Sequence, residues 1–325
     1  MSFLTTYQQR PPTELILNSK RGDQIGNADG YKAFELQTEI TARKHERLMV
    51  YLKKAFVPFS FYCISANQKN NKLDVKETIT TGDISYTITI PDGNYTITTL
   101  NSEVKSLLEA GSIAGGHDFT YTITYEEATN KNTFILATGT NAVKTEFLMS
   151  SGSNATTSLF RVFGFASSDK EFTPSANLVS TYVCDVADGL DSLHIKSNLV
   201  GDNIRSTFNS VNGGEILIIP VDREPNNILF YDDSSNPFKH LLPQTSFKRI
   251  EIKFTDNHDN IVHFNNAPFT LILVVEYLFK EDELKSLEQR GLTYPIDPLK
   301  QIRLQKSKLF NLMINKIHKK NNVIY

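Results

Sequence analysis

Tryptophan is absent from the 325-residue chain, and cysteine occurs only twice, at Cys63 and Cys184. Two cysteines exclude a disulfide-rich secreted scaffold and a zinc site built from several thiolates. The longest apolar run, Phe269–Val275, is far shorter than the roughly 18 residues of a membrane span and fits a buried strand. The first twelve residues show neither a basic nor an apolar leader region, so we expect a protein that stays in a reducing compartment.

Acidic residues are missing from Leu299–Tyr325, although the whole chain has a net charge of only −2. This segment carries +7, so the remainder of the chain carries −9. Its spacing predicts a basic amphipathic helix, with Ile302, Leu309, Met313 and Ile317 on one face. The candidate interaction residues of this tail are its cations: Lys300, Arg303, Lys306, Lys308, Lys316, Lys319 and Lys320.

Alternation of apolar and polar residues runs through most of the chain. Ile84–Ile90 and Phe119–Tyr125 alternate apolar residues with serine or threonine, as half-buried strands do. More than a dozen such segments are separated by turn signals such as Asp92-Gly93, without a βαβ rhythm. This pattern predicts an antiparallel sandwich or barrel.

One internal helix interrupts the strands. Leu100, Val104, Leu107 and Leu108 share a helical face, and we expect Gly111 to end the helix. We therefore predict residues 72–150 to be a strand–helix–hairpin insertion in a β-sandwich that spans residues 31–279. Residues 1–30 show no pattern and predict an extended N-terminal arm, and residues 280–325 predict a helical, basic tail.

Sequence patterns of catalysis are missing: no HExxH, G-x-S-x-G, P-loop or G-x-G-x-x-G occurs. His258 and His263 flank Asp259 and leave a metal site open as an alternative to a polar turn, which we favour. Asp232-Asp233 is likewise either a carboxylate pair or, as we favour, a solvated turn. We predict no enzyme activity, no catalytic residue, no cofactor and no metal.

A tripeptide known from integrin ligands, Arg21-Gly22-Asp23, lies within a longer pattern. That pattern runs through Ile16–Arg21, Gly26, Tyr31–Ile40 and Leu48–Ile64. It is similar to the opening of minor capsid and penton jelly-roll proteins of large eukaryotic double-stranded DNA viruses, virophages and polinton-like elements. We therefore regard receptor binding by the tripeptide as the weaker interpretation.

Three further segments resemble the same family in the same order. Ile90–Thr96, followed by the helix, is similar to its IPDGNYT element, and Leu193–Leu199 is similar to its LYIxSNL region. Ile250–Ile252 and Thr270–Val275 look like its last pair of strands, with Asn257–Asn260 in place of a glycine turn. No resemblance covers residues 280–325.

The resemblance implies an all-β, antiparallel jelly-roll sandwich and a structural role in an icosahedral capsid, as a penton at the vertex or as a minor capsid protein. It implies that the major capsid protein and other capsid proteins are partners, that the chain is a homo-oligomer (a pentamer if it is a penton), and that it is found in virions assembled in the host cytoplasm. The basic tail then contacts capsid protein, an inner membrane or the genome. A receptor- or carbohydrate-binding sandwich remains the alternative, and a cupin-like enzyme is a third class that lacks its metal ligands.

Overall fold

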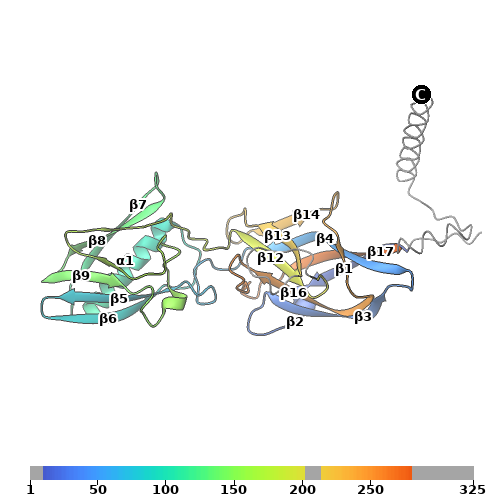
Figure 1. The fold of residues 1–325 in the computed structure, drawn as a ribbon, viewed down its shortest axis with the longest axis horizontal. Helices are drawn as coiled ribbons and strands as arrows, with labels where there is room; N and C mark the ends of the chain where they lie inside the picture. Colours follow the sequence, from blue (N-terminus) through green and yellow to red (C-terminus); the bar gives the residue numbers. More distant parts are fainter. Residues whose placement is uncertain (1–9, 202–213, 280–325) are drawn as a thin grey trace, which may run out of the picture.

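The computed structural model describes residues 10–201 and 214–279 and places them in two lobes that lie end to end (Figure 1). Each lobe has a hydrophobic core of its own. Residues 10–63, 189–201 and 214–279 form the first lobe, which we call the sandwich lobe. Residues 64–188 lie between them in the sequence and form the second, which we call the inserted lobe.

Two antiparallel sheets form the sandwich lobe, and strands distant in sequence lie side by side in both. The first sheet contains, in spatial order, β1 (Thr13–Asn18), β17 (Thr270–Phe279), β4 (Glu46–Pro58) and β14 (Ile228–Asp232), with the short β15 (His240–Leu241) also paired to β4. The second contains β13 (Glu215–Pro220), β12 (Ser192–Ser197), β16 (Ser246–Thr255), β3 (Tyr31–Thr41) and β2 (Asp23–Gln24). The expected β-sandwich is thereby confirmed.

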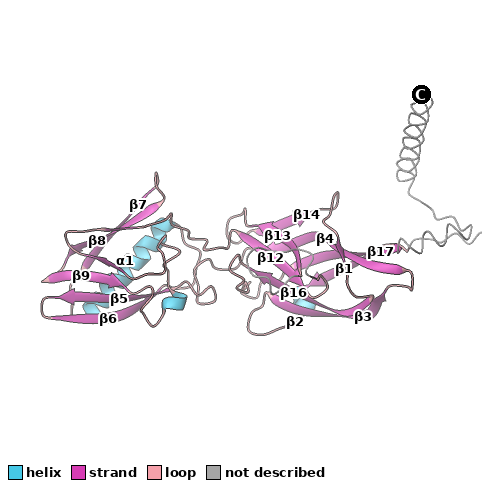
Figure 2. Ribbon diagram, viewed as in Figure 1, coloured by secondary structure: helices cyan, strands magenta, loops and turns pink. Residues whose placement is uncertain are grey.

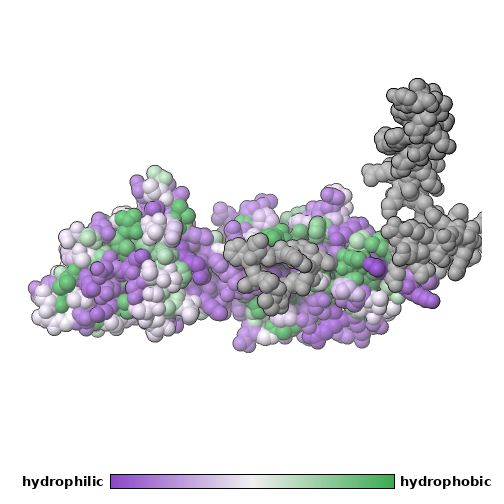
Figure 3. Space-filling model, viewed as in Figure 1, coloured by the Kyte–Doolittle hydropathy of each residue, from purple (hydrophilic) through white to green (hydrophobic). Residues whose placement is uncertain are grey.

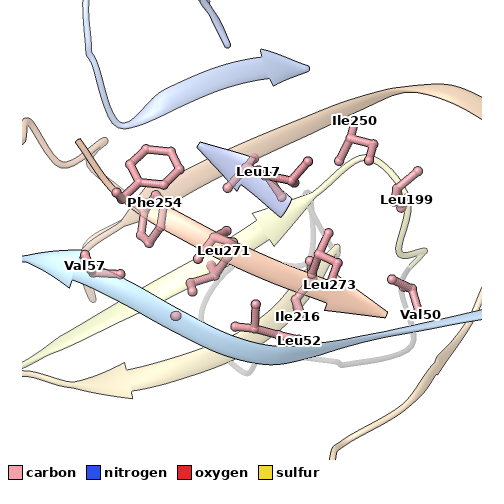
Figure 4. Close-up of a cluster of buried hydrophobic side chains, with 14 of the residues drawn as sticks. Leu17, Val50, Leu52, Val57, Leu199, Ile216, Ile250, Phe254, Leu271 and Leu273 are labelled. Atoms are coloured by element: carbon pink, nitrogen blue, oxygen red, sulfur yellow. The ribbon is translucent and has the colours of Figure 1, made fainter. Parts of the chain in front are cut away.

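The core of the sandwich lobe is the inward set of alternating side chains from both sheets (Figure 4). Leu271 and Leu273 of the first sheet lie close to Ile216, Ile250 and Phe254 of the second in this view. The predicted burial of the last two long strands is confirmed, since all six named side chains are fully buried: Ile250, Ile252, Phe254, Leu271, Leu273 and Val275. Each such side chain contributes about 1.5–3 kcal/mol through removal from water.

The inserted lobe combines two smaller sheets with one long helix (Figure 2). One sheet contains, in order, β10 (Lys170–Phe172), β9 (Ala142–Phe147), β5 (Lys72–Ile79) and β6 (Gly82–Thr89); the other contains β11 (Leu178–Val179), β8 (Lys131–Thr138) and β7 (Thr120–Glu126). The helix α1 (Ile97–Ala114) buries Leu100, Val104 and Leu108 against this core. Thr96 begins the helix, because its side chain and that of Thr99 each accept a hydrogen bond from the other's backbone N–H. No helix in the described part of the chain is long and apolar enough to cross a membrane.

Several boundaries differ from those expected. Residues 13–18 are not part of an arm but form β1, which pairs with β17 along its whole length. The inserted lobe is wider than residues 72–150, because Leu159, Phe163 and Leu178 also belong to its core. The helix continues past Gly111 to Ala114. Gly111 is a packing position and not a helix end, because a Cβ there would collide with the Tyr86 ring.

Candidate interaction surfaces

The two histidines considered as metal ligands lie in the turn that joins β16 to β17. His258 Nε2 is 3.6 Å from Asp188 Oδ1, so its partner is a carboxylate of the inserted lobe. Within residues 10–201 and 214–279, no group of three His, Cys, Asp or Glu side chains is arranged to hold a metal ion. His258 is thus part of a turn that contacts Asp188 across the two lobes.

The adjacent Asp232 and Asp233 have separate partners. Asp232 accepts a hydrogen bond from Ser234 and pairs with Lys54 at 2.9 Å, and these contacts, the Ser234 bond first, lower its pKa to about 2. Asp233 accepts a hydrogen bond of 2.9 Å from the Tyr231 hydroxyl, and burial together with this bond raises the pKa of Tyr231 to about 12. Neither carboxyl is arranged to share a proton with the other, so this pair ends β14 as a structural turn.

A buried carboxylate that the sequence did not reveal lies in the inserted lobe. Glu77 of β5 is fully buried, and its Oε1 accepts hydrogen bonds of 2.6 Å from the hydroxyls of both Tyr86 and Tyr121. Its Oε2 accepts one of 2.8 Å from Ser112 and lies 3.1 Å from His117 Nδ1. Since every partner comes from a different part of the lobe, Glu77 joins β5, β6, α1 and β7.

This cluster contains groups used in catalysis, but its chemistry is that of a structural network. Burial is the largest effect on both tyrosines, and with the adjacent Glu77 it raises the pKa of Tyr86 and of Tyr121 well above the usual range. Neither hydroxyl ionises near neutral pH. Glu77 and His117 are buried, and their polar atoms are used by one another and by neighbouring side chains.

The outer face of the first sheet carries exposed apolar side chains near the end that faces the inserted lobe. Phe56 of β4 and Phe230 of β14 are directly opposite in register, with ring centroids 5.0 Å apart, yet they are 38% and 55% exposed. Ile228 is 59% exposed on the same strand, and Ile16 of β1 is 70% exposed at the opposite edge. The exposed Phe56–Phe230 pair is apolar surface of the kind that protein contacts use, and Ile16 is a separate exposed apolar residue at the other edge.

Beside β14 the surface is hollowed by the turn that follows β13. The hollow is lined by Asp222, Arg223, Glu224, Asn227 and Ile228. A second groove follows β6 and α1 in the inserted lobe and is lined by Tyr86 and by small helix residues such as Ala110 and Gly111. Neither combines aromatic rings with converging carboxylates or amides, the combination that a sugar site would require.

The tripeptide Arg21-Gly22-Asp23 lies in the sandwich lobe, between a short helix and a short strand. Arg21 ends the short helix η1 (Ser19–Arg21), and Asp23 begins β2; both are exposed. The seven tail cations lie outside the described residues: Lys300, Arg303, Lys306, Lys308, Lys316, Lys319 and Lys320.

The waist between the lobes is hydrophilic on the face shown in Figure 3. Asp188, which is almost fully buried there, accepts hydrogen bonds from Arg161 and from Asn70 of the inserted lobe and lies beside His258 of the sandwich lobe. The lobes are therefore joined by several polar contacts: Asp188 lies beside His258, and Asn94 and Asn70 of the inserted lobe form hydrogen bonds with the backbone of Phe61 and Cys63.

Comparison with known proteins gives little beyond this geometry. No family model matches the sequence, and no curated protein matches it. Among solved structures, the mavirus penton protein is similar with a TM-score of 0.41 and 11% identity, over 83% of this chain and 100% of that chain. A TM-score at this level does not establish a shared fold.

Proposed function

We propose that this chain is a structural virion protein, a penton or minor capsid protein built on a jelly roll. The observation that carries the proposal is the nesting of strand pairs in the sandwich lobe. Its eight main strands, in chain order, are β1, β3, β4, β12, β13, β14, β16 and β17. The first pairs with the eighth, the second with the seventh, the third with the sixth and the fourth with the fifth.

Such nesting is what results when a long antiparallel hairpin is rolled into two facing sheets of four, which is the jelly-roll arrangement. The four ordered sequence motifs that resemble penton and minor capsid proteins support the same interpretation. The inserted lobe falls between the third and fourth strands, β4 and β12, so it extends one loop of the roll. A fold alone does not determine a function, and the capsid role depends on the combination of strand nesting and motif order.

The proposed partners are the major capsid protein, other capsid proteins and further copies of this chain. A penton would form a ring through head-to-tail contacts that close at five. Native mass spectrometry of the purified full chain would give the ring size, and cryo-electron microscopy of particles would place the density. We expect five copies around each vertex for a penton. A chain that binds a glycan array as a monomer and is absent from particles would contradict the proposal and support the carbohydrate-binding alternative.

We also propose that the basic tail, residues 299–325, contacts capsid protein, either its own or a neighbour's. Seven cations without an anion need an acidic or anionic partner, and the rest of the chain carries −9. Deleting residues 299–325 should leave the thermal unfolding transition of the sandwich unchanged and reduce incorporation into particles. Normal incorporation with unchanged particle stability would exclude an assembly role, and selective loss of membrane or genome attachment would instead identify an anionic surface as the partner.

A further inference from the structure

We propose that copies of this chain dock edge to edge, with the Ser19–Arg21 turn and β1 of one copy placed against the hollow beside β14 of the next. The proposal rests on the ring suggested above and assigns the two surfaces that would build it. The occupant of the hollow is thus a second copy of this chain.

The two surfaces lie on opposite edges of one sheet. The strand order is β1, β17, β4, β14, so β1 and β14 are three strand spacings apart, about 14 Å in the plane of the sheet. The Ser19–Arg21 turn of one copy therefore does not reach the hollow of the same copy. Surfaces on opposite edges are available to two neighbours at once, which is the requirement for a head-to-tail ring.

The surfaces also lie at the same level along the strands. Asn18, which directly precedes the turn, pairs with Thr270; Thr270 pairs with Phe56; and Phe56 pairs with Phe230. These four residues form one row across the sheet. A contact between neighbours around an axis parallel to the strands closes into a ring only if its two halves lie at equal height, and this row meets that condition.

Charge is complementary between the two surfaces. Lys20 and Arg21 are exposed on the β1 side, and within the described ranges no ion pair engages either side chain. On the β14 side, Asp222 already pairs with Arg223 at 3.5 Å, whereas the exposed Glu224 has no such partner among the residues described. Glu224 is therefore the carboxylate that we expect to meet Arg21 of the neighbouring copy.

Apolar surface accompanies the charges on both sides. Ile16 is 70% exposed beside the turn, and Ile228 and Phe230 are 59% and 55% exposed beside the hollow. Apolar side chains surrounded by charged ones form the usual core and rim of a protein interface. Ile16 lies one row from Phe230, because it pairs with Ile272, which pairs with Lys54, the partner of Asp232. We expect Ile16 to pack beside Phe230 of the neighbour, while Arg21 pairs with Glu224 at the rim.

A charge swap tests the pairing. In the full chain, Arg21→Glu and Glu224→Lys should each raise the concentration at which the oligomer dissociates by at least about tenfold, because each places like charges together. The double variant should return within about threefold of the wild type, since it restores opposite charges with exchanged positions. Arg249→Glu, on the central strand β16 of the other sheet, is the matched control and should leave assembly unchanged.

The apolar contact is tested by comparing one substitution in the proposed interface with an equally exposed control. Ile16 and Ile113 are each 70% exposed, but Ile113 lies on α1 of the inserted lobe. Ile16→Thr should weaken association, and Ile113→Thr should not. For weak association, Ile16→Cys/Phe230→Cys in a Cys63→Ala/Cys184→Ala background should give a ladder of covalent oligomers under mild oxidation. In the same background, Ile16→Cys alone and Phe230→Cys alone should each give dimers at most.

The outcomes separate this inference from the proposed function. The ring itself would be excluded by a wild-type chain that does not associate together with a double-cysteine variant that forms no covalent ladder in particles. A ring that survives both single charge reversals, or that the double variant does not restore, would overturn the assignment of these edges while leaving the capsid role intact. Crosslinking of Phe230→Cys to a different capsid protein would likewise overturn the second copy as the occupant.

Discussion

Arg161 and Asp188 are joined by two hydrogen bonds, from Nε to Oδ1 at 2.8 Å and from Nη2 to Oδ2 at 3.3 Å. Asn70 Nδ2 donates a third, of 3.0 Å, to the same carboxylate, and His258 of the sandwich lobe lies beside it. Asp188 thus neutralises a cation of the inserted lobe at the point where that lobe meets the other. Its contact with His258 is one of the polar connections at the waist of the molecule.

Replacing Arg161 by methionine should loosen this connection. The variant leaves a buried carboxylate without its cation, and a hydrogen bond to a charged group contributes about 1.5–3 kcal/mol. Hydrogen exchange should show faster exchange in residues 64–71 and 185–190, with β16 and β17 unaffected. The double variant Arg161→Met/Asp188→Asn should recover part of the loss because no charge stays unpaired. An unchanged exchange pattern in the single variant would refute this role.

Replacing Gly111 by alanine should destabilise the inserted lobe. A Cβ at this site would lie 2.3 Å from the Tyr86 ring, so Gly111→Ala requires the ring, or the helix, to shift. Alanine gains about 1 kcal/mol in helix propensity over glycine, but overpacking of this kind costs about 1–3 kcal/mol. We expect a net loss of thermal stability in the inserted lobe, measured by calorimetry. Ser106→Ala, at an exposed position of the same helix, is the control; a stabilised Gly111→Ala would contradict the close packing.

The loss of folding stability at acid pH should depend on Asp74. Burial alone would raise its pKa, but hydrogen bonds from Thr87, Asn154 and Ser153 outweigh burial and lower it. A lowered folded pKa stabilises the fold fully above the unfolded value of about 3.9, and this contribution is lost as the pH falls through the folded value.

Asp74→Asn should therefore be less stable at pH 7 and should lose less stability between about pH 5 and pH 2 than the wild type. Urea unfolding at several pH values measures both effects. Glu127→Gln, at an exposed turn position, should keep the wild-type slope. If the free energy of unfolding falls equally with pH in Asp74→Asn and in the wild type, this carboxyl does not contribute to the loss of stability in acid.

The sequence predicted best the strands with a long, clear pattern. Ile250–Phe254 alternates apolar and charged residues and so defines an inward face, whereas Leu271–Val275 is continuously apolar and was recognised as a buried strand by that run. β1 is only six residues long, and it is held by pairing between Thr13 and Val275, which are distant in the sequence. Its two inward leucines were too few to distinguish a strand from an arm.

The inserted lobe was underestimated for a related reason. Leu159, Phe163 and Phe165 belong to its core, but they lie in turns and irregular segments where no period exists. Glu77 is an inward position of β5 filled by a carboxylate, so the alternation pattern gave no sign of its burial. The hollow beside β14 is formed by the turn that follows β13, and neither composition nor residue spacing could predict it.

The outer apolar surface was hidden by the same alternation that revealed the core. β4 has apolar residues on both faces, with Val57 inside and Phe56 outside. Such a strand can be recognised from sequence, but which face is buried depends on the partner sheet. The candidate interface therefore emerged only when strand order and register were known.

The two cysteines should react slowly with thiol reagents in the folded protein. Cys63 is packed against the sandwich core, and burial, followed by the nearby Asp185 and Asp188, raises its pKa to about 11. Burial also raises the pKa of Cys184, although a hydrogen bond with Ser180 opposes the shift. Because the thiolate is the reactive form, Ellman's reagent at pH 8 should modify the native chain at least about tenfold more slowly than the urea-unfolded chain. In Cys184→Ser only Cys63 can react, and we expect this reaction to be slower than that of Cys184 in the folded chain. Rapid modification of the folded variant would contradict the burial of Cys63.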